Sequence, residues 1–320
     1  MRISIAGTPE ELGRRAAAEA AAYLNEAIRE RGEARLLLST GASQFTTLEA
    51  LVREDVDWSK VDMFHLDEYI GLNESHPASF VRYLKERFVS QVPVRRAFFV
   101  DPSQGVETAI ARLTAELDRA PIDVGLIGIG ENAHIAFNDP PADFEDQAAY
   151  KVVTLDERCR RQQLGEGWFP TLEDVPAQAI SMTVDRILRC RHILSAVPYA
   201  VKAQAVSDTV SQPVNNMVPA TILKRHASMT LFLSVSMLKD VCAELTAGGY
   251  PEDTPVAVVY KATWPEQKVV RGTLADIAEK AAHIKKTALI LVGDFLRESD
   301  KRSKLYDPAF AHACREAETP

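Results

Sequence analysis

The most informative transition in the chain is Leu36-Leu37-Leu38-Ser39-Thr40-Gly41-Ala42-Ser43-Gln44. Its first three residues form an apolar run that is too short for a helix and is typical of a strand buried in a parallel sheet. Small polar residues follow, and Thr46-Thr47 begin a predicted helix. Such strand–loop–helix units build the doubly wound α/β folds, in which ligands lie beyond the carboxyl ends of the strands.

The same alternation continues on both sides of this stretch. Thr8-Pro9-Glu10-Glu11 is a capping box with proline at the first helical position, and it predicts a helix to about Arg31, before Gly32. We therefore expect an α/β fold with a doubly wound, mostly parallel, Rossmann-like sheet. The other predicted strands are Arg2–Ala6, Met63–Leu66, Val124–Ile129, His192–Val197 and Met229–Val235, and the other helices are Ser79–Val89 and Val106–Leu117.

Composition excludes several classes of protein. The 320 residues are 46% hydrophobic and 26% charged, which is typical of globular proteins and excludes collagen-like, disordered and coiled-coil chains. The net charge of −8 argues against non-specific binding to nucleic acid or an anionic membrane, but a few local cations could still hold an anionic substrate. Because no apolar run approaches about 20 residues and Met1–Ile5 is too polar for a signal peptide, we expect a cytoplasmic protein.

The four cysteines give no sign of a disulfide framework or a metal site. They form no C-x-x-C pair and have no histidine nearby in the sequence, so we expect reduced, mostly buried thiols and no metal. The cysteines are Cys159, Cys190, Cys242 and Cys314.

The loop after the 36–38 strand is a candidate anion site. Thr40, Gly41, Ala42 and Ser43 are small enough to let the backbone approach an anion, and hydroxyls donate hydrogen bonds. The start of the following helix adds about half a positive charge. A plain strand-to-helix turn is the alternative, because the loop is neither a Walker nor a dinucleotide fingerprint.

The loop after the 63–66 strand, Asp67-Glu68-Tyr69-Ile70-Gly71-Leu72, carries two adjacent carboxylates. Carboxylates at the end of a buried strand are costly unless they are hydrogen-bonded or catalytic. Asp67 is a natural base for removing a proton next to a carbonyl, with Glu68 in a supporting role. A helix cap or a solvated pair is the alternative.

The loop from Gly128 to Pro141 is the most specific of the four candidates. In it His134 lies between Asn132 and Asp139, which can orient the ring and tune its charge for acid/base chemistry. Gly130 supports this arrangement from the other side. A histidine in a loop is often only structural, but glycines before it and a proline-closed turn after it favour a site.

Cations come from two further segments. Lys202 follows the 192–197 strand and can reach a phosphate. Arg158, Arg160 and Arg161 cluster in the segment 156–163, where a solvated helix face is the alternative.

Together these loops resemble the glucosamine-6-phosphate deaminase (isomerase) family, in the superfamily that includes 6-phosphogluconolactonases, over about residues 1–235. The resemblance implies that His134 opens the sugar ring and that Asp67 moves a proton between C1 and C2 of the open chain. Ammonia then leaves as an aldose amine becomes a ketose phosphate, with the 40–43 loop and Lys202 on the phosphate and no cofactor. The motifs are Ser-Thr-Gly-Ala-Ser at 39–43, Asp-Glu-Tyr-Ile-Gly-Leu at 67–72, His-Pro-Ala-Ser-Phe at 76–80, Gly-Glu-Asn-Ala-His-Ile-Ala-Phe-Asn-Asp-Pro at 130–140, Lys202-Ala203 and Pro219–Leu223.

Four departures from the family pattern bear on the substrate. Typical members have aspartate at Asn132, glycine at Ala133 and glutamate at Asp139. Asparagine can orient an imidazole but cannot stabilise imidazolium by charge. The arginine that typical members use on the phosphate would align near Gln163, which leaves Arg160 or Arg161 as substitutes.

The end of the chain resembles a different family. From about residue 229 it is similar to the end of precorrin-4 C11-methyltransferases, which are tetrapyrrole methylases, without their glycine-rich S-adenosylmethionine loop. We predict strands at Val256–Tyr260 and Ala288–Val292 and a helix at Thr273–Ile284, in a segment 236–320 that follows a deaminase-like domain 1–235. The motifs that carry this resemblance include Gly248–Pro251, Thr254–Tyr260, Trp264-Pro265, Arg271–Leu274, Ala288–Gly293 and Leu305–Pro308.

Four functions stay open at this point. The first is a cofactor-free aminosugar-phosphate deaminase/isomerase whose partner is a small sugar phosphate. The second is hydrolysis of a sugar-phosphate lactone, in which Asp67 would be dispensable. The third is a sugar-phosphate-binding protein with weak chemistry, and the fourth is corrinoid methyl transfer through the C-terminal segment. We also expect a homo-oligomer, to which that segment could contribute a surface.

Overall fold

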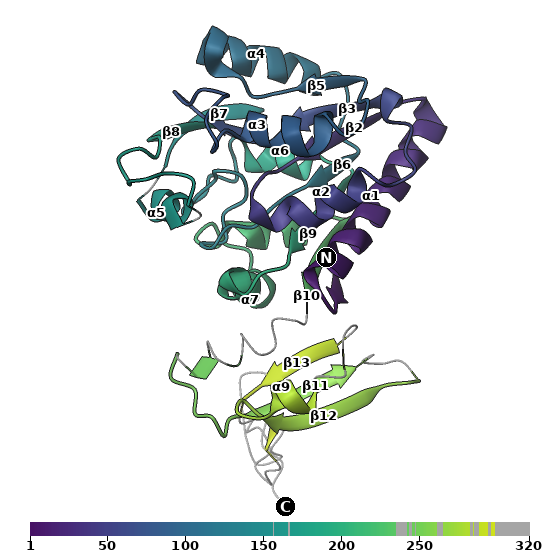
Figure 1. Cartoon of the computed structure of the whole chain (residues 1–320), viewed down its shortest axis with the longest axis vertical. Coiled ribbons are helices and arrows are strands. Elements are labelled where there is room, and N and C mark those ends of the chain that lie inside the picture. Colours follow the sequence, from purple (N-terminus) through teal and green to yellow (C-terminus); the bar gives the residue numbers. More distant parts are fainter. Residues whose placement is uncertain are drawn as a thin grey trace, which may run out of the picture. The chain divides into compact units, whose positions relative to one another are not determined.

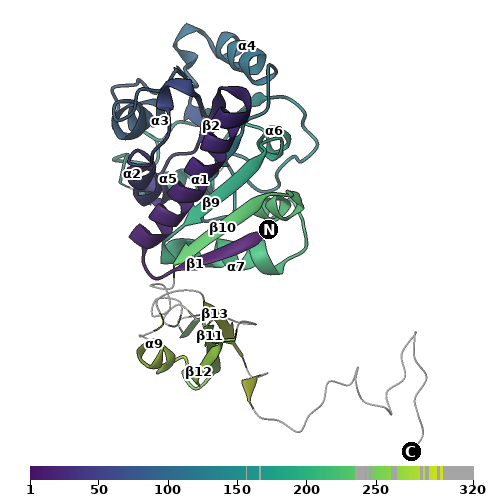
Figure 2. The ribbon, with the colours of Figure 1, turned by 90° about the vertical axis from the view of Figure 1, so that its right-hand side faces the viewer.

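The computed structural model describes residues 1–234 apart from 156 and 166, and beyond them residues 242, 245–246, 248–260, 265–281, 284, 288–293 and 296–297. The chain divides into two compact units, Met1–Met237 and Leu238–Pro320, and each is described by itself (Figures 1 and 2). The predicted division between residues 235 and 236, Trp264, Cys314 and the Leu305–Pro308 motif lie outside the described residues.

A seven-stranded sheet forms the centre of the first unit, in the order β1-β10-β9-β6-β2-β3-β5. Every neighbouring pair is parallel, which confirms the doubly wound, mostly parallel fold (Figure 2). The chain leaves β2 toward β3 and β5 on one side, and it returns through β6 to β9 and β10 on the other. The strands are β1 (Arg2–Ala6), β2 (Ala34–Leu38), β3 (Val61–His65), β5 (Arg96–Phe98), β6 (Val124–Leu126), β9 (His192–Val197) and β10 (Met229–Ser234).

Helices cover both faces of this sheet because successive strand residues point to opposite sides. Leu36 and Leu38 pack with α1, α2 and α3, whereas Leu37 and Phe64 pack with α4, α6 and α7. The helices are α1 (Pro9–Arg31), α2 (Phe45–Leu51), α3 (Phe80–Leu84), α4 (Val106–Leu117), α5 (Glu157–Gly165), α6 (Val184–Leu188) and α7 (Ala203–Ser211); short helical turns are η1 (Ala42–Gln44), η3 (Lys85–Val89), η5 (Ala200–Lys202) and η6 (Pro219–Arg225).

Helix α1 begins and ends as its sequence predicts. The Thr8 hydroxyl accepts a hydrogen bond from the backbone N–H of Glu11 (3.1 Å), and Gly32 ends the helix at φ 78°, in the left-handed region. Gly13 lets α1 pack tightly on α2, because a Cβ at this position would lie 2.5 Å from the backbone of Thr46.

A second, antiparallel sheet was not expected from the sequence. It has the order β4-β8-β7, with β4 (Asp67–Tyr69) directly after β3, β7 (Tyr150–Thr154) and β8 (Gln178–Met182). In this sheet Asp67 pairs with Ser181, and the Tyr150 hydroxyl donates a hydrogen bond to the backbone oxygen of His65 (2.6 Å). The exit of β3 is therefore held in place by two elements distant in sequence.

The second unit contains a three-stranded antiparallel sheet, β12-β11-β13, and the short helix α9 (Ile277–Lys280). Strands β11 (Pro255–Tyr260) and β13 (Ala288–Val292) fall where they were predicted. The predicted helix Thr273–Ile284 is wrong at both ends: the observed helix stops at Lys280, and Thr273 belongs to β12 (Lys268–Thr273). The Asp276 carboxylate accepts a hydrogen bond from the backbone N–H of Thr273 (2.8 Å). That contact holds a turn, so the helix begins only at Ile277.

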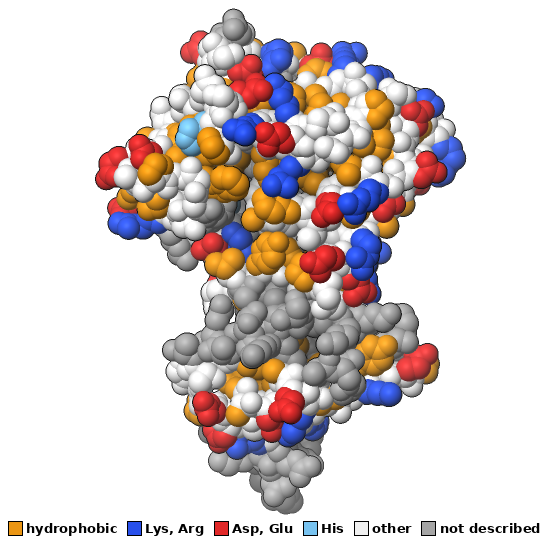
Figure 3. All heavy atoms as spheres, viewed as in Figure 1, with side chains coloured by type: hydrophobic (Ala, Val, Ile, Leu, Met, Phe, Trp, Pro, Cys, Tyr) orange, Lys and Arg blue, Asp and Glu red, His pale blue; other side chains and the backbone are white. Residues whose placement is uncertain are grey.

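Neither unit offers a membrane-spanning helix among its described residues, because none of their helices is both long and apolar enough. On the face of the first unit shown in Figure 3, side chains of both charges are interspersed. That the chain binds no nucleic acid stays a prediction.

Candidate active site

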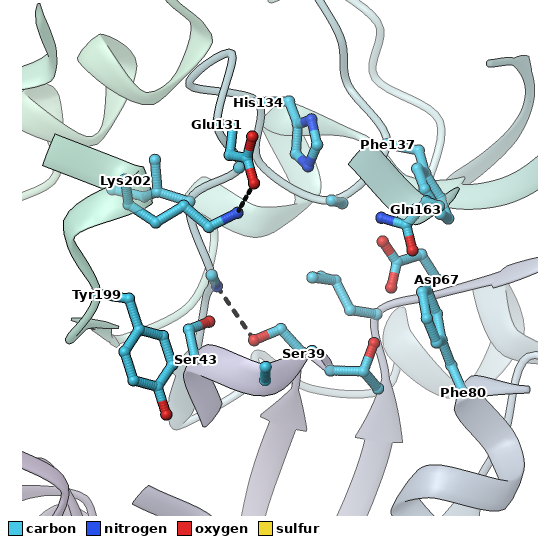
Figure 4. Close-up of a pocket in the computed structure, with 18 of the residues that line it drawn as sticks. Ser39, Ser43, Asp67, Phe80, Glu131, His134, Phe137, Gln163, Tyr199 and Lys202 are labelled. Atoms are coloured by element: carbon cyan, nitrogen blue, oxygen red, sulfur yellow. Dashed lines mark hydrogen bonds and ion pairs between the residues drawn. The ribbon is translucent and has the colours of Figure 1, made fainter. Parts of the chain in front are cut away.

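A cavity of about 170 Å³ lies at the carboxyl ends of four neighbouring strands, β9, β6, β2 and β3 (Figure 4). Between β6 and β2 the strand order reverses, which is where doubly wound sheets bind their ligands. The lining residues are Ser39, Thr40, Gly41, Ala42, Ser43, Leu66, Asp67, Phe80, Gly128, Ile129, Gly130, Glu131, His134, Ala136, Phe137, Gln163, Tyr199, Val201 and Lys202.

All four residues of the candidate anion loop, Thr40, Gly41, Ala42 and Ser43, line this cavity. Gly41 has φ 103°, a conformation that favours glycine at the entry into η1. Hydrogen bonds tie the loop to its neighbours: the Ser39 hydroxyl accepts from the backbone N–H of Gly128 (3.1 Å), and the Tyr83 hydroxyl donates to the backbone oxygen of Gly41 (3.0 Å). The side-chain amide of Gln44 donates to the backbone oxygen of Ala196 in β9 (3.3 Å).

Asp67 is buried at the cavity wall, with its carboxylate directed into the cavity (Figure 4). Burial, together with the charge of adjacent Glu68, raises the pKa of Asp67 to about 8. A carboxyl group with a pKa in this range is suited to accept and return a proton near neutral pH.

The neighbouring Glu68 has a structural role in this geometry. Its carboxylate accepts hydrogen bonds from the Ser79 hydroxyl (2.9 Å) and the backbone N–H of Val81 (2.8 Å), at the start of α3. Burial raises the pKa of Glu68 to about 7, although these hydrogen bonds act to lower it. The helix-cap alternative considered for the two carboxylates therefore describes Glu68, while Asp67 faces the cavity.

His134 reaches the cavity from the loop after β6, and one of its two expected partners, Asp139, faces the ring. Its ring Nδ1 lies 2.9 Å from Oδ1 of Asp139, at ion-pair distance but without hydrogen-bond alignment. Asn132 does not orient the ring: its side-chain oxygen accepts from the backbone N–H of His134 (3.1 Å), and its amide donates to Asp139 (2.9 Å). The group facing the imidazole is thus an aspartate, which can stabilise imidazolium by charge.

Gly130 leaves the space that the His134 ring occupies. A Cβ at Gly130 would lie 2.2 Å from Nε2 of the ring, so any side chain there would displace the imidazole. Ala133, where typical members have glycine, adopts the left-handed conformation with φ 63°. Alanine adopts the left-handed region of φ at a cost in free energy, and the loop holds Ala133 there.

Of the predicted cations, the structure brings Lys202 to the cavity and leaves Arg160 and Arg161 outside it. Lys202 Nζ lies 3.8 Å from a carboxylate oxygen of Glu131. Arg161 is exposed and pairs with Glu157 one helical turn away, so its position does not support the expected phosphate contact. Arg160 donates to backbone oxygens at Leu172 and Val175 (2.5 and 3.1 Å).

Several lining residues were missed in the sequence, among them Glu131, Phe80 and Tyr199. Gln163 is buried, accepts a hydrogen bond from the Tyr69 hydroxyl (2.7 Å) and lies beside Asp67 in Figure 4. One signal could have found it, because Gln163 stands where the resemblance placed the family's phosphate-binding arginine.

A cysteine also approaches the histidine. Donor atoms of His134, Asp139 and Cys159 all lie within 4.8 Å of one another, the one such group of three found among the described residues. Burial raises the pKa of Asp139, but contacts with His134, Asn132 and Cys159 outweigh it and hold the pKa below its usual value. Sequence spacing could not predict this grouping, since Cys159 belongs to α5 and His134 to the loop after β6.

The fold and the cavity define a doubly wound α/β protein whose site combines a carboxyl group, an imidazole and a small-residue anion loop. Residues 7–232 match the glucosamine-6-phosphate isomerases/6-phosphogluconolactonase family, and the chain belongs to this family. A second match, to the tetrapyrrole (corrin/porphyrin) methylases, covers residues 194–278 and so includes most of β9 and all of β10, as well as part of the second unit.

Individual relatives agree with the family. The glucosamine-6-phosphate deaminase of Streptococcus pneumoniae serotype 4 is 33% identical over 208 residues, covering 65% of this chain and 88% of that protein. The solved structure of a monomeric glucosamine-6-phosphate deaminase aligns with a TM-score of 0.66 and 29% identity over 73% of this chain and 97% of its own. A putative 6-phosphogluconolactonase from Neisseria gonorrhoeae, with 19% identity and a TM-score of 0.59, covers 73% of this chain and 98% of its own, and shares the fold.

Proposed function

We propose that the chain is an aminosugar-phosphate deaminase/isomerase, which converts glucosamine 6-phosphate or a related hexosamine phosphate to a ketose phosphate and ammonia. One observation carries the proposal: Asp67, His134 and the 40–43 loop line a single cavity at the reversal point of the sheet. The 33% identical deaminase relatives support it.

The phosphate is assigned to the 40–43 loop and Lys202. Small side chains expose the backbone there, Ser43 and Thr40 supply hydroxyl donors, and Lys202 supplies the positive charge. Lys202 also faces Glu131 at 3.8 Å, so a phosphate that approaches it competes with a carboxylate for the same ammonium group. Anchoring the phosphate fixes the distance from the sugar carbons to the opposite wall of the cavity.

His134 is assigned the opening of the sugar ring. This step takes a proton from the C1 hydroxyl and delivers one to the ring oxygen, and an imidazole can do both near neutral pH. Asp139 lies 2.9 Å from Nδ1 and stabilises the ring while it is protonated. The negative charge that Asn132 lacks is thereby supplied from the other side of the loop.

Asp67 is assigned the proton transfer between carbons. Its carboxylate removes the proton from C2 of the open chain while O1 takes up a proton from solvent, which gives an enolamine. The carboxyl group then returns its proton to C1 and the nitrogen loses one to solvent, which gives an imine at C2. Water then adds to the imine and ammonia leaves. The pKa of about 8 makes the carboxylate a stronger base than an exposed aspartate, as removal of a proton from carbon requires.

The test is release of ammonia from glucosamine 6-phosphate by the purified chain. We expect Asp67→Asn and His134→Gln each to lower kcat by about 10²–10⁴-fold. Two matched controls lie outside the cavity and should keep the parental rate: Asp174→Asn, at an exposed carboxylate, and His192→Gln, at a ring stacked on Tyr23.

Parental rates in both site variants would reject the assignment of the site. Turnover of a sugar-phosphate lactone that survives Asp67→Asn would favour the lactonase instead. Affinity for sugar phosphates without any turnover would favour a binding protein, and calorimetric binding of S-adenosylmethionine would favour methyl transfer. The homo-oligomer also stays a prediction, to be measured by sedimentation.

A further inference from the structure

Three different donor atoms lie close together on the Nδ1 side of the His134 ring. They are the imidazole nitrogen, a carboxylate oxygen of Asp139 and the Cys159 sulfur, all within 4.8 Å of one another. His134 is 9% exposed and Cys159 1% exposed. Cys159 is fixed there by α5, which packs it in a cluster with Tyr69 and Phe169.

Two of these side chains carry buried polar atoms without a hydrogen-bond partner, His134 Nδ1 and Asp139 Oδ2. A buried donor or acceptor that is left unsatisfied costs about 1–3 kcal/mol, so such atoms are rare unless something else satisfies them. Asn132 donates only to the other oxygen of Asp139, at 2.9 Å. Oδ2 of Asp139 and, when the ring carries no proton there, Nδ1 of His134 therefore offer lone pairs to a ligand.

The donor set matches one class of ligand. Imidazole nitrogen, carboxylate oxygen and thiolate sulfur are the ligands of Zn²⁺, with bonds of about 2.0–2.3 Å, whereas Mg²⁺ and Ca²⁺ prefer oxygen alone. Tetrahedral bonds of that length put ligand atoms roughly 3.3–3.8 Å apart, so side chains within 4.8 Å need to shift by about an ångström or less. We propose that His134, Asp139 and Cys159 form a site for a thiophilic divalent cation such as Zn²⁺, and that its binding stops proton transfer at His134.

The second half of this proposal rests on the proposed function. The cation bonds to Nδ1 and to the thiolate, and the thiol proton goes to solvent. The imidazole then keeps a single proton on Nε2 and has no free lone pair with which to accept another. A ring in this state cannot exchange protons with a sugar, so the cation acts as a reversible inhibitor that does not compete with the substrate's phosphate.

Binding is tested on the full chain after dialysis against a chelator. Co²⁺ serves as the spectroscopic probe, and we expect a thiolate-to-cobalt charge-transfer absorption that saturates at one cation per chain and is displaced by Zn²⁺. Cys159→Ser should lose this absorption and bind Zn²⁺ at least about 100-fold more weakly, measured by competition with a chromophoric chelator. Cys190→Ser is the matched control, because Cys190 is also buried in the same unit but does not belong to the group of three donor side chains.

Inhibition is tested in parallel through ammonia release. We expect Zn²⁺ to lower kcat of the parent and of Cys190→Ser, Mg²⁺ to have no effect, and a chelator to restore the rate. The proposal is overturned if the parent chain shows no cobalt–thiolate absorption, or if that absorption survives in Cys159→Ser. A chain that gives the absorption but releases no ammonia keeps the cation site and refutes the proposed function, so the two failures are distinguishable.

Discussion

The Asp67→Asn substitution should make the protein more stable, and increasingly so as the pH rises. Burial, with a smaller contribution from Glu68, raises the pKa of Asp67 to about 8 in the folded protein, while an aspartate in an unfolded chain ionises at about 3.9. Between these values the folded state holds a proton that the unfolded state has released. Rising pH therefore favours unfolding through this group.

The size of the effect follows from the same two values. Below about pH 4 both states carry the proton, so Asp67 adds no pH dependence. From about pH 4 to 8 the parent's unfolding equilibrium shifts toward the unfolded state about tenfold per pH unit, a total of the order of 5 kcal/mol. Above about pH 8 both states are ionised and the difference is constant. Asparagine does not ionise in this pH range, so the stability of the variant does not include this pH-dependent loss.

The assay is urea unfolding of parent and variant at intervals of about one pH unit between roughly pH 5 and 9, followed by tryptophan fluorescence. Asp139→Asn gives a control of opposite sign, because its surroundings lower the pKa of Asp139 and its loss should cost stability above the acid range. If the stability difference between Asp67→Asn and the parent stayed flat across the range, the reasoning about Asp67 would be refuted.

Four further outcomes are expected. Gly130→Ala should lower kcat about 100-fold by displacing the His134 ring, with little change in the unfolding midpoint, and a parental kcat would contradict the packing described. Glu68→Ala should cost about 3 kcal/mol of stability, measured by urea unfolding, because it leaves the Ser79 hydroxyl and the backbone N–H of Val81 without their acceptor. In a pH series, kcat/KM should rise with pH and level off near pH 8, as the catalytic carboxyl ionises; a profile already flat at pH 6 would count against it. Lys202→Ala should raise KM for the phosphorylated substrate at least about tenfold, whereas Arg161→Ala, outside the cavity, should not.

The sequence was sufficient wherever structure is local. The strand–loop–helix pattern around residues 36–47 and the cap at Thr8 depend on neighbouring residues, so the parallel sheet and α1 could be predicted from them. The loop that brings His134 and Asp139 together is likewise a single short segment. Neighbouring residues did not predict which side of a helix faces the cavity. Arg161 and Gln163 are close together in α5, yet only Gln163 lines the cavity.

Long-range contacts account for most of what the sequence did not predict. The antiparallel partner of Asp67 is Ser181, in β8. Hydrophobic periodicity does not show which strands pair when they are so far apart in the sequence. Cys159 meets His134 for the same reason, because α5 carries it there. Asp67 and Glu68 were distinguished in the sequence, but the way in which Glu68 supports the site was not, since it depends on hydrogen bonds to the start of α3.

The hydrogen bonds from Gly128 to Ser39 and from Gln44 to Ala196 join the carboxyl ends of three strands into one rigid rim. The conformational entropy of ordering the 40–43 loop is therefore lost when the chain folds, and little of it is left to be lost when the proposed sugar phosphate binds. A protein built in this way should bind its ligand with small changes in backbone hydrogen exchange at the loop. The measured affinity should then reflect the contacts with the ligand, with little free energy spent on ordering the loop.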